Sequence, residues 1–366
     1  MPMIPLSSEL TAVTDLVALE SRWSALERRV GSPFFLSWTW MRSWLAGLDT
    51  PPVLLAVTDD DGIDIALGLF VRTTERRRGL PVQQMRLHDT GITAQDAVTI
   101  EYNSLLCEAG LEAAAWYAAI RALRSHGRYD EIIVSGATDR TARILEGLGH
   151  VVHSRAETTS AYVDLAALRE QGVGDADAYI ATLGKNTRSQ LRRSMRLYAE
   201  NGPLRLEPCT DIDQFFTELG EHHEAKWRAA GGAGATANSD YMTFHRHMIA
   251  EALPKGEVEL LRASAGDRSF GWLYNFVCRG RVLFYLSGFR AEEDNRLKPG
   301  LVTHALAIEH HLKRGASVYD FMGGTNRYKT SLGQPGPDIL AVALQRKTPL
   351  LMIENLARKL KSRISP

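Results

Sequence analysis

The sequence predicts an α/β (α+β) protein made of two tandem lobes, each a mixed twisted sheet flanked by helices. The first observation is length, because 366 residues exceed one average domain and suffice for two that each bury a core. The second is a repeated order of elements, and the third is a short similarity between the two copies. We expect lobes at 1–165 and 166–366, the second including a basic linker helix and a C-terminal helix.

The repeated order is a strand hairpin, a helix and a buried strand. In the first half, strands at Val53–Thr58 and Ile65–Thr73 flank an Asp/Gly turn, which is typical of a hairpin. A helix at Gly110–His126 then leads into a strand at Glu131–Ser135, the connection found in α/β layers. The matching elements of the second half are Val258–Ser264, Phe270–Cys278, Val282–Phe289, Pro299–Arg314 and Val318–Met322.

The two copies also resemble each other where the last strand ends. The first reads Gly136-Ala-Thr-Asp-Arg140 and the second Gly323-Gly-Thr-Asn-Arg327. Chance similarity is one interpretation, but the matching order of neighbouring elements favours an internal duplication.

Apolar residues spaced three and four apart predict further helices. These are Glu9–Val30, Phe34–Leu48, Val173–Glu200, Ile212–Ala229, Ser239–Leu253 and Pro349–Ile364. The helix at Val173–Glu200 is the basic linker helix, and the last is the C-terminal helix.

Bulk charge and cysteine content exclude several classes of protein. Lys plus Arg and Asp plus Glu number 43 each, so no global field draws the chain to nucleic acid or to an anionic membrane. The three cysteines are few and far apart, which excludes a disulfide framework and a Cys-based zinc site. No targeting or membrane-spanning segment is recognised. We therefore expect a cytoplasmic protein.

The first candidate site is the loop between a strand and a helix in the second half. The strand ends near Phe289, and the helix begins at Pro299 after Arg296 and Lys298. A helix N-terminus offers backbone N–H groups and a positive dipole end to a pyrophosphate. The alternative is an ordinary strand-to-helix connection. The candidate donor-binding residues are Arg296, Lys298, Gly300 and Leu301.

The second candidate site follows the last strand of that half. Asp320 lies inside an apolar strand, where a carboxylate needs partners. Tyr328 and Lys329 follow a Gly-containing loop, at the open end of a sheet where ligands bind in this architecture. A structural role for Asp320, and a core-capping role for Tyr328 beside a solvated Lys329, are the alternatives.

A basic stripe lies on the linker helix. Lys185, Arg188, Arg192 and Arg196 share one face at helical spacing. Such a stripe predicts a clamp for a phosphorylated substrate, although most charge runs are simply solvated helix faces.

The histidines predict no metal site, because none has the HExxH spacing and neighbours on a helix point apart. Either His222 or His223, beside Glu224 and Trp227, is a candidate general base, and the alternative is a half-buried structural residue. No GxSxG elbow, P-loop or Rossmann fingerprint occurs, which excludes the enzyme classes built on them.

Several of these segments together resemble a known family. The segments are Pro33–Trp40, Lys185–Arg188 with Leu191–Arg193, His223 with Trp227, Lys298–Gly300, Tyr319–Phe321 and Tyr328-Lys329. In this order the chain resembles GNAT-superfamily acetyltransferases of the cellulose-biosynthesis (CelD-like) type, distant relatives of the Fem aminoacyltransferases. In place of the Q/R-x-x-G-x-G/A loop of many GNAT enzymes, Arg296-Leu-Lys-Pro-Gly300 has a single glycine and longer spacing.

The resemblance implies two GNAT-like lobes, with acyl-CoA, typically acetyl-CoA, bound by the second and no metal. An amine, on a small molecule or a carrier, would attack the thioester directly. Asp320 or His223 would take the amine proton, and Tyr328 or Tyr285 would protonate the leaving thiolate. Lys185, Arg188, Arg192, Trp227 and Lys329 would bind substrate.

Nothing in the first lobe matches Tyr328-Lys329, so we expect that lobe to be non-catalytic. Two alternatives stay open for the second lobe. One is a Fem-like aminoacyltransferase that uses aminoacyl-tRNA, and the other is a GNAT-like lobe that only binds a ligand.

Overall fold

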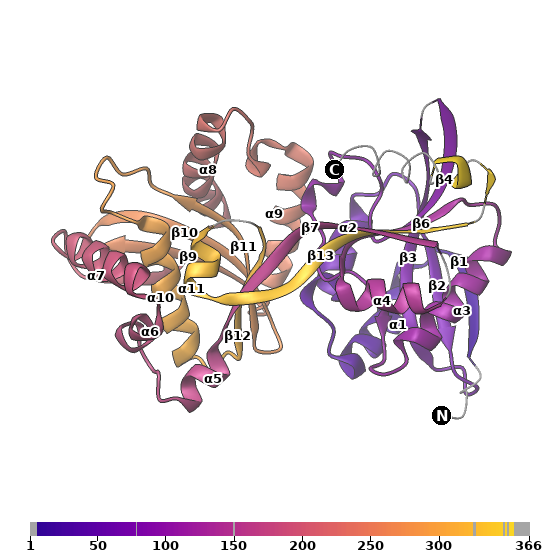
Figure 1. Ribbon diagram of the computed structural model, residues 1–366, viewed down its shortest axis with the longest axis horizontal. Helices are drawn as coiled ribbons and strands as arrows, with labels where there is room; N and C mark the ends of the chain where they lie inside the picture. Colours follow the sequence, from indigo (N-terminus) through magenta and orange to yellow (C-terminus); the bar gives the residue numbers. More distant parts are fainter. Residues whose placement is uncertain are drawn as a thin grey trace. The chain divides into compact units, whose positions relative to one another are not determined.

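The computed structural model describes residues 6–77, 79–148, 151–324, 327–346, 348, 349 and 351–354. Its chain divides into two units (Figure 1). The first comprises Met1–Glu157 with Asp338–Pro366, and the second comprises Thr158–Pro337. This division differs from the expected lobes at 1–165 and 166–366, because the last strand pairs within the first unit through Ile339–Gln345.

The first unit is built on a sheet with the strand order β1-β2-β3-β4-β6-β13. Only β4 and β6 of this series are parallel, and α3 connects them. The elements of this unit are β1 (Ser7–Ala12), α1 (Leu16–Val30), α2 (Trp38–Ala46), β2 (Val53–Thr58), β3 (Asp64–Arg77), β4 (Leu80–Leu87), β5 (Leu106–Cys107), α3 (Glu112–Ser125), β6 (Glu131–Thr138) and α4 (Asp139–Gly147).

The second unit has a sheet with the strand order β7-β12-β11-β10-β9-β8. Here only β11 and β12 are parallel, and α10 connects them. Its elements are α5 (Leu165–Glu170), α6 (Ala176–Thr182), α7 (Lys185–Ala199), β8 (Leu204–Pro208), α8 (Ile212–Ala229), α9 (Ser239–Ala252), β9 (Val258–Ala265), β10 (Arg268–Cys278), β11 (Arg281–Phe289), α10 (Pro299–Lys313), β12 (Val318–Gly323) and α11 (Arg327–Leu332). Two long strands, β7 (Val151–Asp164) and β13 (Gln334–Gln345), contain residues of both units.

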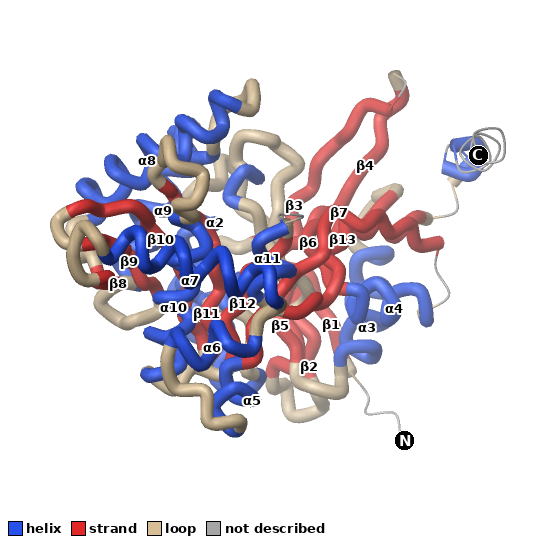
Figure 2. Tube along the Cα trace, turned by 60° about the vertical axis from the view of Figure 1, so that its left-hand side comes forward, coloured by secondary structure: helices blue, strands red, loops and turns tan. Residues whose placement is uncertain are grey.

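Helices cover both faces of the second sheet. On one face α10 packs closely, since a Cβ on Gly271 would lie 2.0 Å from the Thr303 hydroxyl oxygen. On the other face α8 packs closely, since a Cβ on Gly288 would lie 2.5 Å from the Leu219 carbonyl oxygen. Figures 1 and 2 both show α6 and α7 beside α10. The predicted fold class is confirmed: each unit is a mixed sheet flanked by helices.

Three helix predictions need correction. Residues 9–12 of the predicted helix Glu9–Val30 belong to strand β1, and α1 starts only at Leu16, where Asp15 accepts hydrogen bonds from Val17 N and Ala18 N. The predicted helix Phe34–Leu48 is a 3₁₀ turn followed by α2, which Ser37 caps.

The linker helix predicted at Val173–Glu200 is two helices, α6 and α7. Leu183 and Gly184 between them have extended ψ values of 159° and 147°, so the helical hydrogen bonds stop there. Residues 349 and 351–354 of the predicted C-terminal helix are helical, and 355–364 lie outside the described residues. No described helix combines the length and apolarity needed to span a bilayer.

Candidate active site of the second unit

The facing edges of β11 and β12 part after a short ladder. Their recorded pairs run only from Arg281 with Val318 to Leu283 with Asp320. Beyond this point β11 continues to Phe289 and β12 to Gly323. Backbone N–H groups are strong donors, and among the described residues the ladder with β12 does not extend along the rest of β11. The divergence lies between two of the candidate segments, the strand that ends near Phe289 and the strand that contains Asp320.

A β-bulge reshapes β11 at the start of this divergence. Asn275 pairs with Phe284 and Tyr274 pairs with Leu286, which leaves Tyr285 as the extra residue. A bulge bends the strand and redirects its side chains, and bulges are frequent beside active sites. Tyr285 turns toward α9, where its hydroxyl lies 3.1 Å from His245 Nε2.

A buried aromatic group lies on the α10 face of the divergence. The Tyr328 ring stacks on His304 with centroids 5.2 Å apart and planes inclined by 15°. Phe284 meets the same imidazole edge-on at 4.6 Å. Burial, assisted by the charge of Lys329, lowers the pKa of His304 to about 3, so this imidazole is neutral. Burial also raises the pKa of Tyr328, so its hydroxyl keeps its proton at neutral pH.

Lys329 is held in place rather than solvated. Its side chain is buried, and Nζ donates a hydrogen bond to the carbonyl oxygen of Gly323 at the end of β12. The ammonium also lies 5.9 Å from the centre of the Phe284 ring, within the range of a cation–π contact. Lys329 is therefore a fixed positive charge beside Tyr328.

His223 of α8 lies against the opposite face of β11. Its Nδ1 is 3.0 Å from the carbonyl oxygen of Ser287. Because a carbonyl only accepts hydrogen bonds, Nδ1 carries the hydrogen and Nε2 keeps the lone pair. Nε2 is buried with no hydrogen-bond partner among the described residues, and burial lowers the pKa of His223. A neutral imidazole with a fixed tautomer and a free lone pair suits a general base.

The surroundings of His223 are partly open. Trp227, one helical turn further on, is 46% exposed, and its ring centre is 6.2 Å from that of His223. A Gly-rich loop is tied to the same helix, because Gly234 N and the Thr236 hydroxyl donate hydrogen bonds to Glu224. Such an exposed indole offers a contact surface to an acceptor molecule.

Asp320 is engaged on both carboxylate oxygens. Oδ2 accepts from the Arg281 guanidinium at 2.6 Å, and Oδ1 accepts from Met322 N at 2.7 Å. Met322 has a positive φ of 58°, and the pairing of β12 with β7 shifts between Asp320 and Met322. These contacts favour a structural role, in which Asp320 stabilises an unusual backbone turn inside the strand.

The predicted donor-binding residues surround the start of α10. No side chain caps this helix, whose first residue is Pro299. A Cβ on Gly300 would lie 3.3 Å from the Phe289 ring, so the glycine lets α10 begin beside the diverging end of β11, with Leu301 next along the helix. Lys298 N donates to Ser194 of α7 at 2.8 Å. Arg296 forms a bidentate ion pair with Asp294, and both side chains contact solvent.

The basic stripe lies on the solvent side of α7. Lys185 and Arg192 are exposed, and Arg188 donates only to the carbonyl of Ala181 at 3.0 Å among its recorded hydrogen bonds. The buried side of the helix is formed by Leu191, Ser194 and Tyr198. The stripe is thus accessible to a large anionic substrate.

The structure brings Tyr328 and Lys329 together on one side of β11 and places His223 with Trp227 on the other. Asp320 and Tyr285 instead contact residues outside this pair of groups. Sequence reasoning missed His304, which supports Tyr328, and Ser287, which orients His223. A histidine inside an apolar helix gives little signal by itself, because its stacking partner comes from a distant segment.

The first unit also contains two parallel strands whose recorded pairing covers only three positions, as in β11 and β12. There, β4 and β6 pair from Gln84 with Glu131 to Arg86 with Ile133. The divergence that follows is closed by Asn103, whose Nδ2 donates to Leu87 O at 2.9 Å and to Ser135 O at 3.0 Å.

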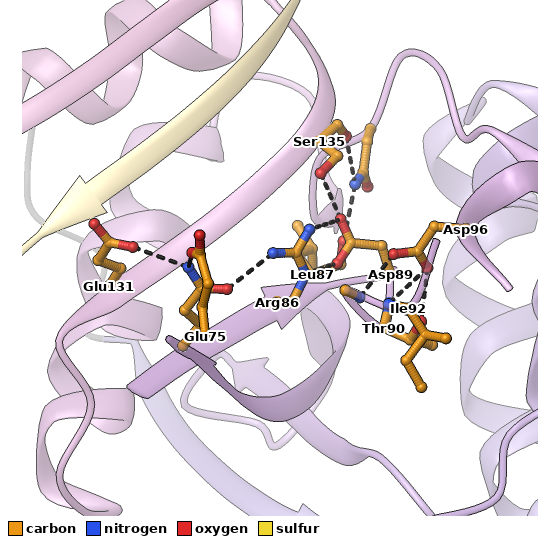
Figure 3. A network of polar contacts seen from close by, with 12 residues as sticks. Glu75, Arg86, Leu87, Asp89, Thr90, Ile92, Asp96, Glu131 and Ser135 are labelled. Carbon is orange, nitrogen blue, oxygen red and sulfur yellow. Dashed lines mark hydrogen bonds and ion pairs between the residues drawn. The ribbon is translucent and has the colours of Figure 1, made fainter. Parts of the chain in front are cut away.

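The approach of that closing segment depends on a glycine. Gly136 has a φ of 66°, and a Cβ there would lie 1.9 Å from the Ile100 carbonyl oxygen. Figure 3 shows the polar network around this point, in which Asp89 accepts hydrogen bonds from both Arg86 and Ser135. In the first unit, a side chain therefore bridges the two diverging parallel strands. No such bridge is recorded between β11 and β12 among the described residues of the second unit.

Comparisons with known proteins agree with this difference between the units. Residues 185–330 match the model of a family described as acetyltransferase (GNAT) domain, Acetyltransf_6. This stretch contains β11, α10, β12 and the Tyr328-Lys329 pair, and no residue of the first unit. No curated protein sequence matches the chain.

Solved structures share the fold along nearly the whole chain. FemX aligns with 94% of this chain and 99% of its own, with a TM-score of 0.60 and 11% identity. A conserved protein of unknown function from Bacteroides thetaiotaomicron aligns over 92% and 100%, with a TM-score of 0.55 and 12% identity. L-PGS from Bacillus licheniformis aligns over 94% and 96%, with a TM-score of 0.52 and 11% identity. Residues 185–330 are thus similar to an acetyltransferase (GNAT) domain, within a chain that has the fold of FemX.

Proposed function

We propose that the second unit is an N-acyltransferase that moves an acyl group, acetyl in the first instance, from acyl-CoA to an amine. The observation that carries this proposal is the divergence of β11 from β12 beside the uncapped start of α10. The match of residues 185–330 to a GNAT domain supports it. We also propose that the chain is of the CelD-like type. Cysteines that form no disulfide among the described residues suit the proposed cytoplasmic location.

The donor would lie across the start of α10 and the diverging edge of β11. Backbone N–H groups and the helix dipole at Gly300 and Leu301 suit a pyrophosphate, with Lys298 nearby. Arg296 would exchange Asp294 for a phosphate oxygen, since both form the same bidentate contact. The thioester carbonyl would accept hydrogen bonds from β11 backbone N–H groups, which stabilise the oxyanion that forms.

The transfer needs one base and one acid. His223 Nε2 takes a proton from the amine, directly or through a water, as the nitrogen attacks the carbonyl carbon. The tetrahedral intermediate then expels the thiolate as its C–S bond breaks, and the sulfur receives the proton of the Tyr328 hydroxyl. His223 then releases its proton to solvent and Tyr328 takes one back from solvent, while the charge of Lys329 stabilises the transient tyrosinate. Asp320 and Tyr285 shape the two strands.

A Fem-like aminoacyltransferase is the second candidate. The chain has the fold of FemX, and the basic stripe of α7 is accessible. In that case Lys185, Arg188 and Arg192 would contact the phosphates of an aminoacyl-tRNA.

The third candidate, a lobe that only binds a ligand, would show donor binding without transfer. In all three the first unit binds no donor, because Asn103 closes its strand divergence.

The first prediction tests transfer. Acetyl-CoA should raise the melting temperature of the protein, because a ligand of the native state at one hundred times its Kd adds about 2.7 kcal/mol to the free energy of unfolding. The protein should also transfer labelled acetyl groups from acetyl-CoA to members of a pool of amines. Tyr328→Phe keeps the stack on His304 and should lower turnover roughly ten- to thousandfold without changing the melting temperature by itself. Tyr129→Phe, a buried tyrosine of the first unit, is the matched control. Normal turnover in Tyr328→Phe would assign Tyr328 to the scaffold.

The second prediction concerns pH. A base must be neutral to act, so kcat/KM should fall as pH drops through the pKa of His223, which lies below the usual 6.5. The pH profile of His223→Gln should lack this acidic limb, and its kcat/KM should be about two to four orders of magnitude lower than that of the wild type. His222→Gln, at the neighbouring position, should keep the wild-type profile. An unchanged acidic limb in His223→Gln would contradict the assignment of His223.

The third prediction separates the donors. Under the aminoacyl-tRNA alternative, Arg188→Ala/Arg192→Ala should bind tRNA more weakly, with a log–log salt slope smaller by about 1.4, roughly 0.7 per lost contact. The exposed pair Arg121→Ala/Arg128→Ala should behave as wild type. If the first double variant binds tRNA as wild type does and keeps its acetyl transfer, the tRNA alternative is eliminated.

A further inference from the structure

Three polar side chains, one buried and two half-buried, meet under the C-terminal end of α10, away from the strand divergence. Glu259 comes from β9, and His310 and His311 come from α10. One ligand atom from each of the three residues lies within 4.8 Å of the other two. The neighbouring histidines both reach the carboxylate, although adjacent positions on a helix usually point apart.

The facing atoms of this group lack hydrogen bonds. His310 Nε2, His311 Nε2 and Glu259 Oε2 are all buried and have no hydrogen-bond partner among the described residues. His311 Nε2 is 3.4 Å from Glu259 Oε2, and His310 Nε2 is 3.9 Å from Glu259 Oε1. A buried polar atom without a partner is unfavourable, and one cation bound among the three atoms would satisfy all of them at once.

A fourth polar group borders the same place. Asn275 of β10 pairs directly with Glu259 of β9, so the two side chains lie on the same face of the sheet. Asn275 is fully buried, and both atoms of its amide lack hydrogen-bond partners among the described residues. An amide oxygen can serve a cation as a further ligand, directly or through a water molecule.

We propose that Glu259, His310 and His311 bind a divalent transition-metal ion of the zinc class, with Asn275 or a water as a further ligand. Two imidazoles and one carboxylate are a donor set that zinc accepts. Ligands of one tetrahedral zinc lie roughly 3.3 Å apart, because each bond is about 2.0–2.2 Å long. The observed separations reach that value with small side-chain movements.

The charges around the group fit a cation. A divalent ion binds neutral imidazoles and an ionised carboxylate, and its charge would offset that of Glu259. Arg314 lies 3.4 Å from Oε1 and is 63% exposed, so solvent screens its charge and Oε2 stays available. The ion would fasten the end of α10 to β9.

The test is metal binding by the full-length protein after treatment with a chelator. Zn²⁺ is titrated in competition with a chromophoric chelator, and Co²⁺ is added in a separate experiment to record its visible absorption. We expect one tight Zn²⁺ per chain, tetrahedral-type Co²⁺ bands, and no comparable binding of Mg²⁺. Glu259→Gln and His311→Ala should each weaken Zn²⁺ binding at least tenfold and abolish the Co²⁺ bands. His247→Ala, an exposed histidine of α9, should bind as wild type does.

Glu259→Gln preserves the side-chain shape, so it decides the question even if His311→Ala does not fold. Circular dichroism confirms that each variant is native. Wild-type protein that binds no Zn²⁺ more tightly than Glu259→Gln would overturn the proposal and leave a buried histidine–carboxylate contact. The result does not depend on acyl transfer, because the readout involves neither donor nor acceptor.

Discussion

The short ladder between β11 and β12 is the constraint on which the account of this molecule depends. Two parallel strands joined by a helix crossover would ordinarily pair along their length. Here the recorded pairing stops at Leu283, the bulge at Tyr285 bends β11, and the Asp320–Met322 turn bends β12. These local features keep the strands apart and leave backbone donors facing the place where α10 begins. The side chains proposed for catalysis contribute to this site only because the backbone first provides it.

The two units show how such a divergence is made or abolished. Both contain a parallel pair that starts with three recorded positions. In the first unit, Asn103 bonds the carbonyl oxygens of both strands, and Gly136 allows the approach of the segment that carries it. In the second, aromatic rings of Tyr328 and His304 line the divergence instead.

Sequence patterns predicted the parts of the fold that depend on neighbouring residues. The hairpins, α10 and β12 follow from local alternation, turn residues and Pro299. The break at Gly184 was missed because residues on both sides of it form helices, and a single glycine inside a helical pattern is often tolerated. The burial of Lys329 was not predicted, because its hydrogen-bond partner, the carbonyl of Gly323, depends on how the chain turns back. The meeting of Glu259 with His310 and His311 joins segments far apart in sequence, so no spacing rule could reveal it.

The most direct test of the central claim is hydrogen exchange measured by mass spectrometry with and without acetyl-CoA. A donor bound in the strand divergence of the second unit should slow exchange of backbone amides in 284–304, where the diverging part of β11 and the start of α10 lie. Exchange in 84–103 and 131–138 of the first unit should not change. Protection confined to those first-unit segments, or no protection at saturating acetyl-CoA, would contradict the account.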